Sequence, residues 1–262
     1  MVSGNGSAVE IQGLVRRFGE VAAVDGLDLN VERGTFFGFL GPNGAGKSTT
    51  LKVLTGLLEP SEGTARILGH DIVQEPIEAK RRVGVVPEEL ALFDRLSGWE
   101  YLELVGRLYG MRRPLIRERS GELLELMGLA GEGGKLIVDY SHGMQKKLAL
   151  SAALIHEPEV LFLDEPFEGI DAIAARLIKT ILARLVERKV TVFLTSHVLE
   201  IVERLCTDVA IIHEGRLVAS GSLDQLRSGV RLDEGREVSL EDLFISLVGG
   251  DEQVGRGLSW LA

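Results

Sequence analysis

The chain has 262 residues, of which 45% are hydrophobic and 26% are charged, and this ordinary globular mixture excludes a protein that is disordered throughout. Acidic residues outnumber basic ones by 39 to 29, so the net charge is −10 at pH 7, which disfavours a protein that binds nucleic acid or anionic lipid through its general surface. The single cysteine, Cys206, excludes a disulfide within the chain and is typical of a reducing compartment.

The ends of the chain and its apolar runs bear on its location. Residues 1–7 are small and polar and lack the basic and apolar order of a signal peptide, and residues 249–262 also resemble a loose end. No apolar run approaches the ~20 residues that cross a bilayer. We therefore expect a cytoplasmic protein that reaches a membrane only through another chain.

Segments typical of strands and of helices alternate along the chain, as they do in α/β proteins. Short runs rich in β-branched and aromatic residues predict strands over 9–14, 27–31, 36–40, 65–68, 83–86, 160–163, 190–195, 209–213 and 217–219. Three of these strands are apolar on both faces, which indicates the centre of a parallel sheet that is covered on both sides: 36–40, 160–163 and 190–195. Amphipathic spacing predicts helices over 47–54, 99–109, 121–129 and 176–187.

The order of these segments predicts how the chain is divided. Residues 97–158 show little strand signal, so we expect a helical subdomain inserted into an α/β core of residues 1–96 and 159–226. A short helical tail is predicted over 227–262. Within it, Ser239 and Asp242 form a capping box ahead of an apolar stripe, which suggests packing on a partner chain.

The most informative run in the sequence matches the pattern G-x-x-x-x-G-K-[ST] and lies between a predicted strand and a predicted helix. Its residues, the phosphate loop, are Gly41, Pro42, Asn43, Gly44, Ala45, Gly46, Lys47, Ser48 and Thr49. The glycines let backbone N–H groups turn around phosphate oxygens, and the helix that follows adds its positive N-terminal end. We expect Lys47 to reach the β- and γ-phosphates, Ser48 to bind Mg²⁺ and Thr49 to contact the α-phosphate.

Polar side chains follow two of the predicted central strands. Asp164 and Glu165 come directly after 160–163, at the carboxyl edge where parallel sheets bind ligands. We predict that Asp164 holds Mg²⁺ through water and that Glu165 orients or deprotonates the water that attacks the γ-phosphate. His197 follows 190–195 and would reach the same phosphate from a neighbouring strand, although a histidine at a strand end is more often an ordinary loop residue.

A further run, the signature segment, narrows the class of protein. It lies shortly before Asp164, opens a predicted helix, and consists of Tyr140, Ser141, His142, Gly143, Met144 and Gln145. Taken alone it could be a plain serine-capped helix. It resembles the signature of ATP-binding cassette (ABC) proteins, which usually reads Leu-Ser-Gly-Gly-Gln. Phe18 occupies the place of the family's adenine-stacking aromatic residue, 165–171 resembles its D-loop up to Asp171, and His197 matches its switch histidine. The resemblance covers about 9–226.

This resemblance implies a P-loop NTPase core with a mixed, mainly parallel sheet, an N-terminal antiparallel β subdomain and an inserted helical subdomain. It implies ATP and Mg²⁺ as ligands, with Ser141, Gly143, Gln145 and Asp171 closing over the ATP of a second, facing cassette. Single cassettes of this kind power a separate transmembrane permease. The resemblance therefore implies a cytoplasmic position at the inner face of the membrane, contact with the membrane only through the permease, and no nucleic acid partner.

Some features depart from the family pattern or leave alternatives open. Glu88 replaces the usual glutamine of the family's glutamine loop, and because a carboxylate also ligates Mg²⁺ we expect it to keep that role. The short tail favours an exporter over an importer, and a soluble ABC-type ATPase that is not coupled to transport is the alternative. Four apolar residues either dock the permease or pack the helical subdomain: Leu92, Phe93, Leu96 and Trp99.

Overall fold

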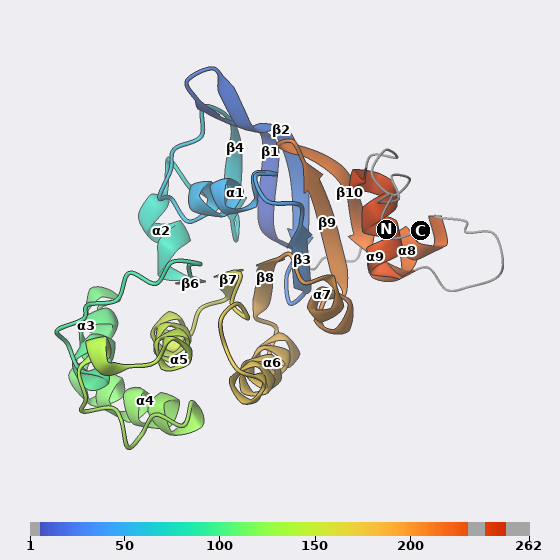
Figure 1. Cartoon of the computed structure of the whole chain (residues 1–262). Helices are drawn as coiled ribbons and strands as arrows, with labels where there is room; N and C mark the ends of the chain where they lie inside the picture. The colour runs from blue at the N-terminus through green and yellow to red at the C-terminus, as the bar shows by residue number, and fades with distance from the viewer. Residues whose placement is uncertain (1–5, 230–238, 250–262) are drawn as a thin grey trace, which may run out of the picture.

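The structure is a computed structural model that describes residues 6–229 and 239–249. The predicted loose ends lie almost wholly outside these ranges, and of the predicted tail 227–262 only 227–229 and 239–249 are described. The described residues form two sheets with helices around them (Figure 1).

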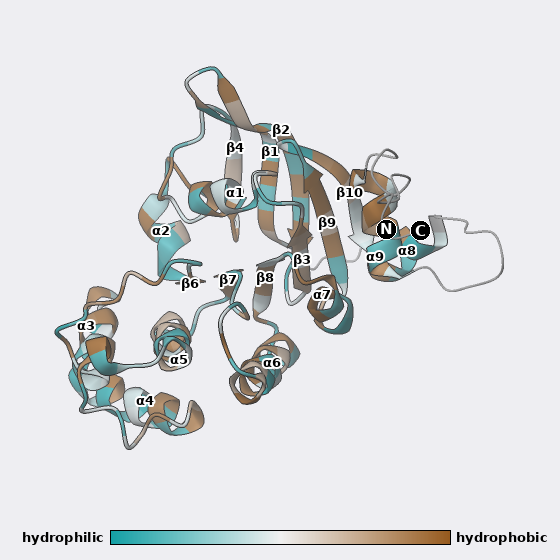
Figure 2. Cartoon of the chain, viewed as in Figure 1, coloured by the Kyte–Doolittle hydropathy of each residue, from teal (hydrophilic) through white to brown (hydrophobic). Residues whose placement is uncertain are grey.

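A six-stranded sheet forms the centre of the fold. In spatial order its strands are β10 (Arg216–Ser222), β9 (Asp208–His213), β3 (Phe36–Leu40), β8 (Thr191–Ser196), β7 (Val160–Asp164) and β6 (Val83–Val86). The strands from β9 to β6 run parallel, and the edge strand β10 runs antiparallel to β9. Every residue of β3, β7 and β8 is buried, which confirms them as the central strands that the sequence predicts. They are among the most apolar parts of the chain (Figure 2).

A second, four-stranded sheet is antiparallel and is the N-terminal β subdomain that the resemblance implies. Its strands in spatial order are β2 (Val21–Glu32), β1 (Ser7–Phe18), β4 (Glu62–Ile67) and β5 (His70–Asp71). Leu14 of β1 and Leu27 of β2 belong to the same buried cluster as Leu51 of helix α1 (Lys47–Leu54), so this sheet and the parallel sheet enclose one core.

The parallel sheet has a second core on its other face, because successive side chains of a strand point to opposite sides. Phe37 and Phe39 of β3 belong to the cluster beneath the antiparallel sheet, whereas Phe36 and Leu40 belong to the cluster on the helical side. Phe193 of β8 lies at the middle of the first cluster, with ring centroids 5.2 Å from Phe37 and 5.5 Å from Phe39. The site-bearing strands are therefore held between two layers.

Helices cover the rest of the parallel sheet. Within residues 97–158 lie α3 (Gly98–Leu108), α4 (Arg113–Leu126), the short 3₁₀ helix η1 (Ile137–Asp139) and α5 (His142–Leu154). They gather at one side of the molecule (Figure 1). The other helices are α2 (Pro76–Arg81), α6 (Ala172–Glu187), α7 (Leu199–Leu205), α8 (Leu223–Gly229) and α9 (Leu240–Val248). No helix within 6–229 or 239–249 is long and apolar enough to cross a membrane. The domain boundaries themselves stay a prediction.

Several helix starts differ from the predicted ones for local reasons. Helix α4 starts at Arg113 instead of 121, because Pro114 fits the first turn of a helix, where its missing N–H is not needed. Helix α6 starts at Ala172 instead of 176, because the Asp171 carboxylate accepts hydrogen bonds from two N–H groups of its first turn. The elements that the sequence did not predict (α2, α7, α8, β5 and η1) are too short to show a clear hydrophobic period.

The tail helix α9 shows the predicted capping box, in which the Ser239 hydroxyl accepts from the Asp242 backbone N–H and the Asp242 side chain accepts from the Ser239 backbone N–H. Leu240 and Leu243 are buried in the core of their own chain. The backbone N–H of Leu240 also donates to Glu203 of α7 at 3.2 Å. The sequence predicts that this stripe packs on a partner chain, but its buried part packs within the chain instead.

Residues 97–158, the helical segment, are joined to the core by hydrogen bonds to the carbonyl oxygen of Val83. It accepts hydrogen bonds from the Tyr109 hydroxyl at 3.1 Å and from Nε2 of His156 at 3.0 Å, and the two rings stack with their centroids 3.5 Å apart. Burial, assisted by the nearby charge of Arg119, lowers the pKa of His156 to about 4. His156 is therefore neutral in the folded protein at neutral pH.

This pKa predicts acid sensitivity of the folded state. Between the ordinary histidine value near 6.5 and about 4, the unfolded chain binds a proton at His156 and the folded chain does not, so stability falls as the pH falls. We expect His156→Gln, which retains a side-chain N–H donor, to flatten the decline of the melting temperature between pH 6.5 and 4. Parallel melting curves against pH for the two proteins would contradict this assignment.

Candidate functional site

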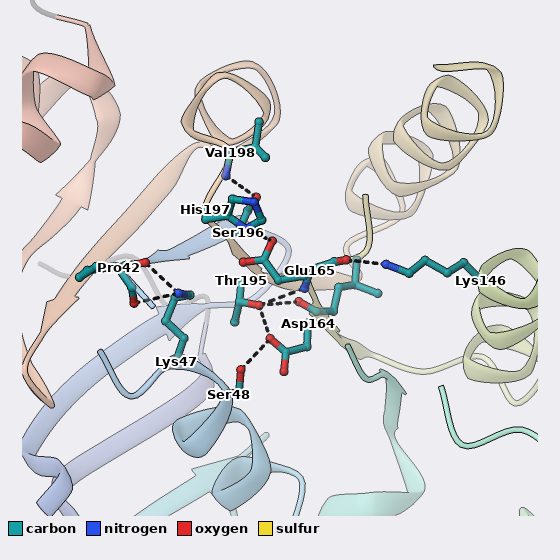
Figure 3. A network of polar contacts seen from close by, with 12 residues as sticks. Pro42, Lys47, Ser48, Lys146, Asp164, Glu165, Thr195, Ser196, His197 and Val198 are labelled. Atoms are coloured by element: carbon teal, nitrogen blue, oxygen red, sulfur yellow. Dashed lines mark hydrogen bonds and ion pairs between the residues drawn. The ribbon is translucent and has the colours of Figure 1, made fainter. Parts of the chain in front are cut away.

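An open cleft of about 430 Å³ lies at the carboxyl ends of the central strands. The phosphate loop follows β3, Asp164 ends β7, and His197 follows β8. Because these strands are parallel neighbours, their ends meet at one edge of the sheet (Figure 3). The cleft is lined by Ala23, Asn43, Gly44, Gly46, Lys47, Ser48, Thr49, Glu88, Glu165, Glu168 and His197. Most of the residues predicted to bind the phosphates and to hydrolyse them are thus brought together.

The phosphate loop has a backbone that requires glycine at defined places. Gly44 has a φ of +80° and Gly46 a φ of +107°, both in the left-handed region. A Cβ atom at Gly46 would lie 2.4 Å from the carbonyl oxygen of Ala23, and one at Gly41 would lie 2.4 Å from that of Ile212. Helix α1 begins at Lys47, directly after this turn, so its free N–H groups lie at the cleft.

Lys47 is buried, and its ammonium group donates to two carbonyls of its own loop. The distances from Nζ are 2.8 Å to the Gly41 oxygen and 3.2 Å to the Pro42 oxygen. Burial lowers the pKa of Lys47, and the carboxylates of Glu165, Asp164 and Glu88 oppose this shift. The cleft thus places a lysine ammonium next to acidic groups and next to the loop that faces the phosphates.

Asp164 lies beneath the cleft and is 3% exposed. Its Oδ1 atom accepts hydrogen bonds from the hydroxyl of Thr195 and from that of Ser48, the latter at 3.4 Å (Figure 3). A carboxylate and a hydroxyl at this distance are hard oxygen donors of the kind that Mg²⁺ prefers. In the described part of the chain no three His, Cys, Asp or Glu residues form a metal cluster. The Asp164 carboxylate and the Ser48 hydroxyl fit Mg²⁺, an ion that commonly takes one or two protein carboxylates and completes its shell with water and phosphate.

Glu165 is 7% exposed and has a φ of +46°, a left-handed conformation that is uncommon for glutamate. Its carboxylate lies 3.0 Å from Nδ1 of His197, and its backbone N–H donates to the hydroxyl of Thr195 at 3.2 Å. Burial raises the pKa of Glu165, whereas His197 and Lys47 oppose the shift. A desolvated carboxylate whose pKa is raised accepts protons more readily than an exposed one.

Three polar side chains at this site were not predicted. Glu168 lines the cleft beside Glu165, and its place within 165–171, the run that resembles the D-loop, was the available signal for it. Thr195 joins Asp164 to Glu165 by hydrogen bonds, but a threonine at the end of a strand carries no mark of such a role. Lys146 lies 19 residues before Glu165 in the sequence, and its Nζ atom donates to the backbone oxygen of Glu165 at 2.8 Å (Figure 3).

The signature segment does not line this cleft. Ser141 caps α5 by accepting from the Met144 N–H at 3.3 Å, and it is exposed, as is His142. A Cβ atom at Gly143 would meet no atom within 4 Å, so the start of the helix is open to an approaching group. The Gln145 amide points elsewhere and donates to the oxygen of Ile137 at 3.4 Å. The roles of these residues toward a nucleotide stay predictions.

Two further predicted contacts lie outside the cleft lining. Phe18, at the end of β1, is half exposed, and the guanidinium of Arg16 lies over its ring at 4.6 Å from the centroid. Asp171 is exposed, and its carboxylate accepts from the N–H groups of Ile173 at 2.9 Å and Ala174 at 2.8 Å. Asp171 thus caps α6 in this structure, and its contact with a nucleotide stays a prediction.

The sequence matches the ABC transporter family over residues 24–168. A daunorubicin/doxorubicin resistance ATP-binding protein of Streptomyces peucetius is 41% identical over 223 residues, which are 85% of this chain and 68% of that protein. The ABC transporter ATP-binding protein NatA of Bacillus subtilis is 36% identical, over 82% of this chain and 87% of NatA. A probable multidrug ABC transporter ATP-binding protein of Escherichia coli, YbhF, is 35% identical over 92% of this chain but only 42% of YbhF.

Solved structures agree. One described as an ATP-binding subunit of an ABC transporter has a TM-score of 0.86 at 30% identity, over 92% of this chain and 99% of that chain. The chain therefore belongs to the ABC transporter family. It is an ATP-binding subunit of that family and an ATPase. A dimeric cassette in a post-hydrolysis state bound to ADP and Pi matches with a TM-score of 0.75 at 24% identity, which shows the shared fold.

The phosphate loop geometry gives a direct test. Gly46→Ala places a Cβ atom 2.4 Å from the Ala23 oxygen at a φ of +107°, so the turn must change shape. We expect the variant to lose nucleotide binding and to be destabilised by about 1–3 kcal/mol. Gly131→Ala is the matched control, because a Cβ atom there meets nothing within 4 Å. ATP binding by Gly46→Ala at the wild-type affinity would disprove this steric account.

Proposed function

We propose that the chain hydrolyses Mg²⁺-bound ATP to drive an exporter whose membrane-spanning permease is a separate polypeptide. The observation that carries this proposal is the convergence of Lys47, Asp164, Glu165 and His197 on one cleft edge beside a phosphate loop. Export is supported by the names of relatives, which include a linearmycin resistance ATP-binding protein and a Nod factor export ATP-binding protein. The chain would then act at the cytoplasmic face of the membrane through its permease.

The proposed nucleotide site uses the groups that the cleft presents. In this proposal the N–H groups of the phosphate loop and Lys47 bind the β- and γ-phosphates, and Thr49, which lines the cleft, contacts the α-phosphate. The Ser48 hydroxyl, Asp164 and the exposed Glu88 are the proposed protein ligands of Mg²⁺, which supplies positive charge to the phosphate oxygens. Asn43, Gly44 and Ala45 shape the turn.

Glu165 is the proposed general base. Its raised pKa and its place in the cleft lining suit a carboxylate that orients and deprotonates the attacking water. His197 lies 3.0 Å from it and is half exposed toward the cleft, so it is placed to hydrogen-bond a γ-phosphate and to hold the carboxylate in position. Thr195 fixes the backbone of Glu165 and the side chain of Asp164 together, so that metal ligand and base keep a constant separation.

A second cassette completes the proposed site. Ser141 and Gly143 are accessible at the start of α5 and lie outside the cleft of their own chain, as groups that contact the ATP of a facing subunit must. Gln145 and Asp171 are proposed for the same surface, and each would first release the partner that it has here, Ile137 and the α6 N-terminus. Phe18 would stack on adenine after Arg16 moves from its ring.

The permease is proposed to dock between β6 and α3. An apolar groove of about 190 Å³ lies there and is lined by Pro87, Leu92 and Tyr101, among others. Phe93 is 58% exposed beside it. Leu96 packs against the core, and the Trp99 ring contacts Gly133 on the far side of α3, which favours a packing role for these two residues. Glu88 lines the cleft, and its sequence neighbours Pro87 and Leu90 line the groove, so Glu88 is the proposed connection between the two.

Replacing the proposed base by its neutral isostere is the test of hydrolysis. Glu165→Gln should bind ATP with unchanged affinity, form an ATP-dependent dimer, and hydrolyse ATP about 10²–10⁴-fold more slowly, because the proton acceptor is lost. Steady-state phosphate release and size-exclusion chromatography with ATP measure both effects. Turnover at the wild-type rate would remove Glu165 from the catalytic role.

Glu88 tests the connection to transport. If it ligates Mg²⁺ and couples the two subunits, Glu88→Gln keeps an oxygen ligand and should retain ATPase activity, whereas Glu88→Ala should lose coupled transport. ATP-dependent uptake into inverted vesicles that contain the chain and its permease measures transport. Glu89→Ala is the neighbouring control, since Glu89 is exposed and does not line the cleft. Undiminished transport by Glu88→Ala would refute the coupling role.

A further inference from the structure

Lys146 is a buried cation that the proposed reaction does not use. It lies in the first turns of α5, the helix that the signature segment opens, and it is 3% exposed. Its Nζ atom donates to the backbone oxygen of Glu165 at 2.8 Å. A buried ammonium group is unfavourable unless hydrogen bonds and opposite charges compensate for the lost water. Here the hydrogen bond to the Glu165 oxygen and the nearby charges of Glu168 and Glu165 compensate for the lost water. The position of Lys146 therefore depends on the loop 165–169.

The accepting carbonyl belongs to a residue in an unusual conformation. Glu165 has a φ of +46°, and such a backbone persists only where its surroundings hold it. Its N–H donates to Thr195, and its oxygen accepts from Lys146 and, at 3.2 Å, from the N–H of Glu168. Lys146 is the contact among these that comes from the helical segment and not from the strands or from the loop itself (Figure 3).

The same helix touches the loop at a second point. A Cβ atom on Gly169 would lie 2.9 Å from Cδ2 of His142, so the imidazole ring at the start of α5 rests on the backbone of Gly169. Helix α5 therefore contacts both ends of 165–169, by a hydrogen bond at Glu165 and by packing at Gly169. A displacement of α5 relative to the sheet must change one or both of these contacts.

We propose that Lys146 is a positioning residue for Glu165, through which the placement of the signature helix sets the placement of the general base. The proposal rests on the role of Glu165 proposed above. When α5 is seated, Lys146 holds the Glu165 peptide so that its carboxylate faces the cleft and His197. When α5 is displaced, the peptide loses that donor and the carboxylate leaves its position, so hydrolysis depends on the state of the helical segment while nucleotide binding at the phosphate loop does not.

Lys146→Met is the informative variant. Methionine fills a similar volume but lacks the charge and the donor, so the contact with Glu165 is lost. Removing one partner of a buried polar contact lowers stability, and the melting temperature therefore separates a loss of fold from a loss of that contact. Lys147→Met is the matched control, because it removes a lysine from the next position of the same helix, and the Lys147 side chain makes no hydrogen bond or ion pair with 165–169. The full-length chain is used throughout, with Mg²⁺ and ATP.

The measurements are kcat and KM for ATP, the affinity for a fluorescent ATP analogue, and the melting temperature. We expect Lys146→Met to lower kcat about tenfold or more, with KM and analogue affinity within about twofold of the wild type, and Lys147→Met to leave all of them unchanged. In single-turnover experiments, adding Lys146→Met to Glu165→Gln should cause no further loss, since Lys146 acts through Glu165.

Other outcomes overturn the proposal. An unchanged kcat for Lys146→Met shows that the contact is dispensable, and a loss of kcat that is matched by losses in analogue affinity and melting temperature shows a general structural role. Full additivity with Glu165→Gln shows that Lys146 acts elsewhere. If Glu165→Gln itself turns over at the wild-type rate, the assignment of the base fails. If Glu165→Gln is slow and Lys146→Met keeps the wild-type kcat, the assignment of Glu165 as the base stands and only the positioning role of Lys146 is refuted.

Discussion

The parallel pairing of β7 with β8 and of β8 with β3 is the constraint on which the rest of the structure depends. It places Asp164 opposite Thr195 and Leu40 opposite Ser196, so three strands end at one level. A single hydroxyl, that of Thr195, then bonds the Asp164 carboxylate and the Glu165 backbone. Full burial of these strands between two cores holds that register, because a slip would move each side chain into a space that is packed around a side chain of another shape.

Because three strands end at one level, several charged side chains lie close together in the cleft. The acidic side chains of Glu88, Glu165 and Glu168 line a pocket that also holds the ammonium of Lys47, and all of them lie in a chain with a net charge of −10. Burial shifts the pKa of Lys47 down and that of Glu165 up, so each group is moved toward its neutral form. A divalent cation would relieve the repulsion among the carboxylates, which supports the metal-bound nucleotide that we propose for this site.

The helical segment is joined to the core through few polar contacts. The backbone oxygen of Val83 accepts hydrogen bonds from the side chains of Tyr109 and His156. The backbone oxygen of Glu165 accepts one from the side chain of Lys146. Both acceptors are backbone oxygens at or near strands that bear on the site. In the proposed mechanism, movement of the helices acts on the loop that carries the proposed base, whereas the phosphate loop packs through Ala45 into the core on the other face of the sheet.

Patterns within short stretches determined much of this protein. The phosphate loop, the central strands, the Asp164–Glu165 pair and the Ser239 capping box were all predictable, because each depends on residues that are close in sequence. Lys146 on Glu165, the neutral His156 and the intramolecular packing of α9 were not. Each depends on burial and on partners brought together by folding, and no local pattern encodes how deeply a lysine or histidine is buried or which distant carbonyl it meets. The sequence by itself thus determined the family and the chemistry of the cleft, and only the tertiary structure decided which groups hold that chemistry in place.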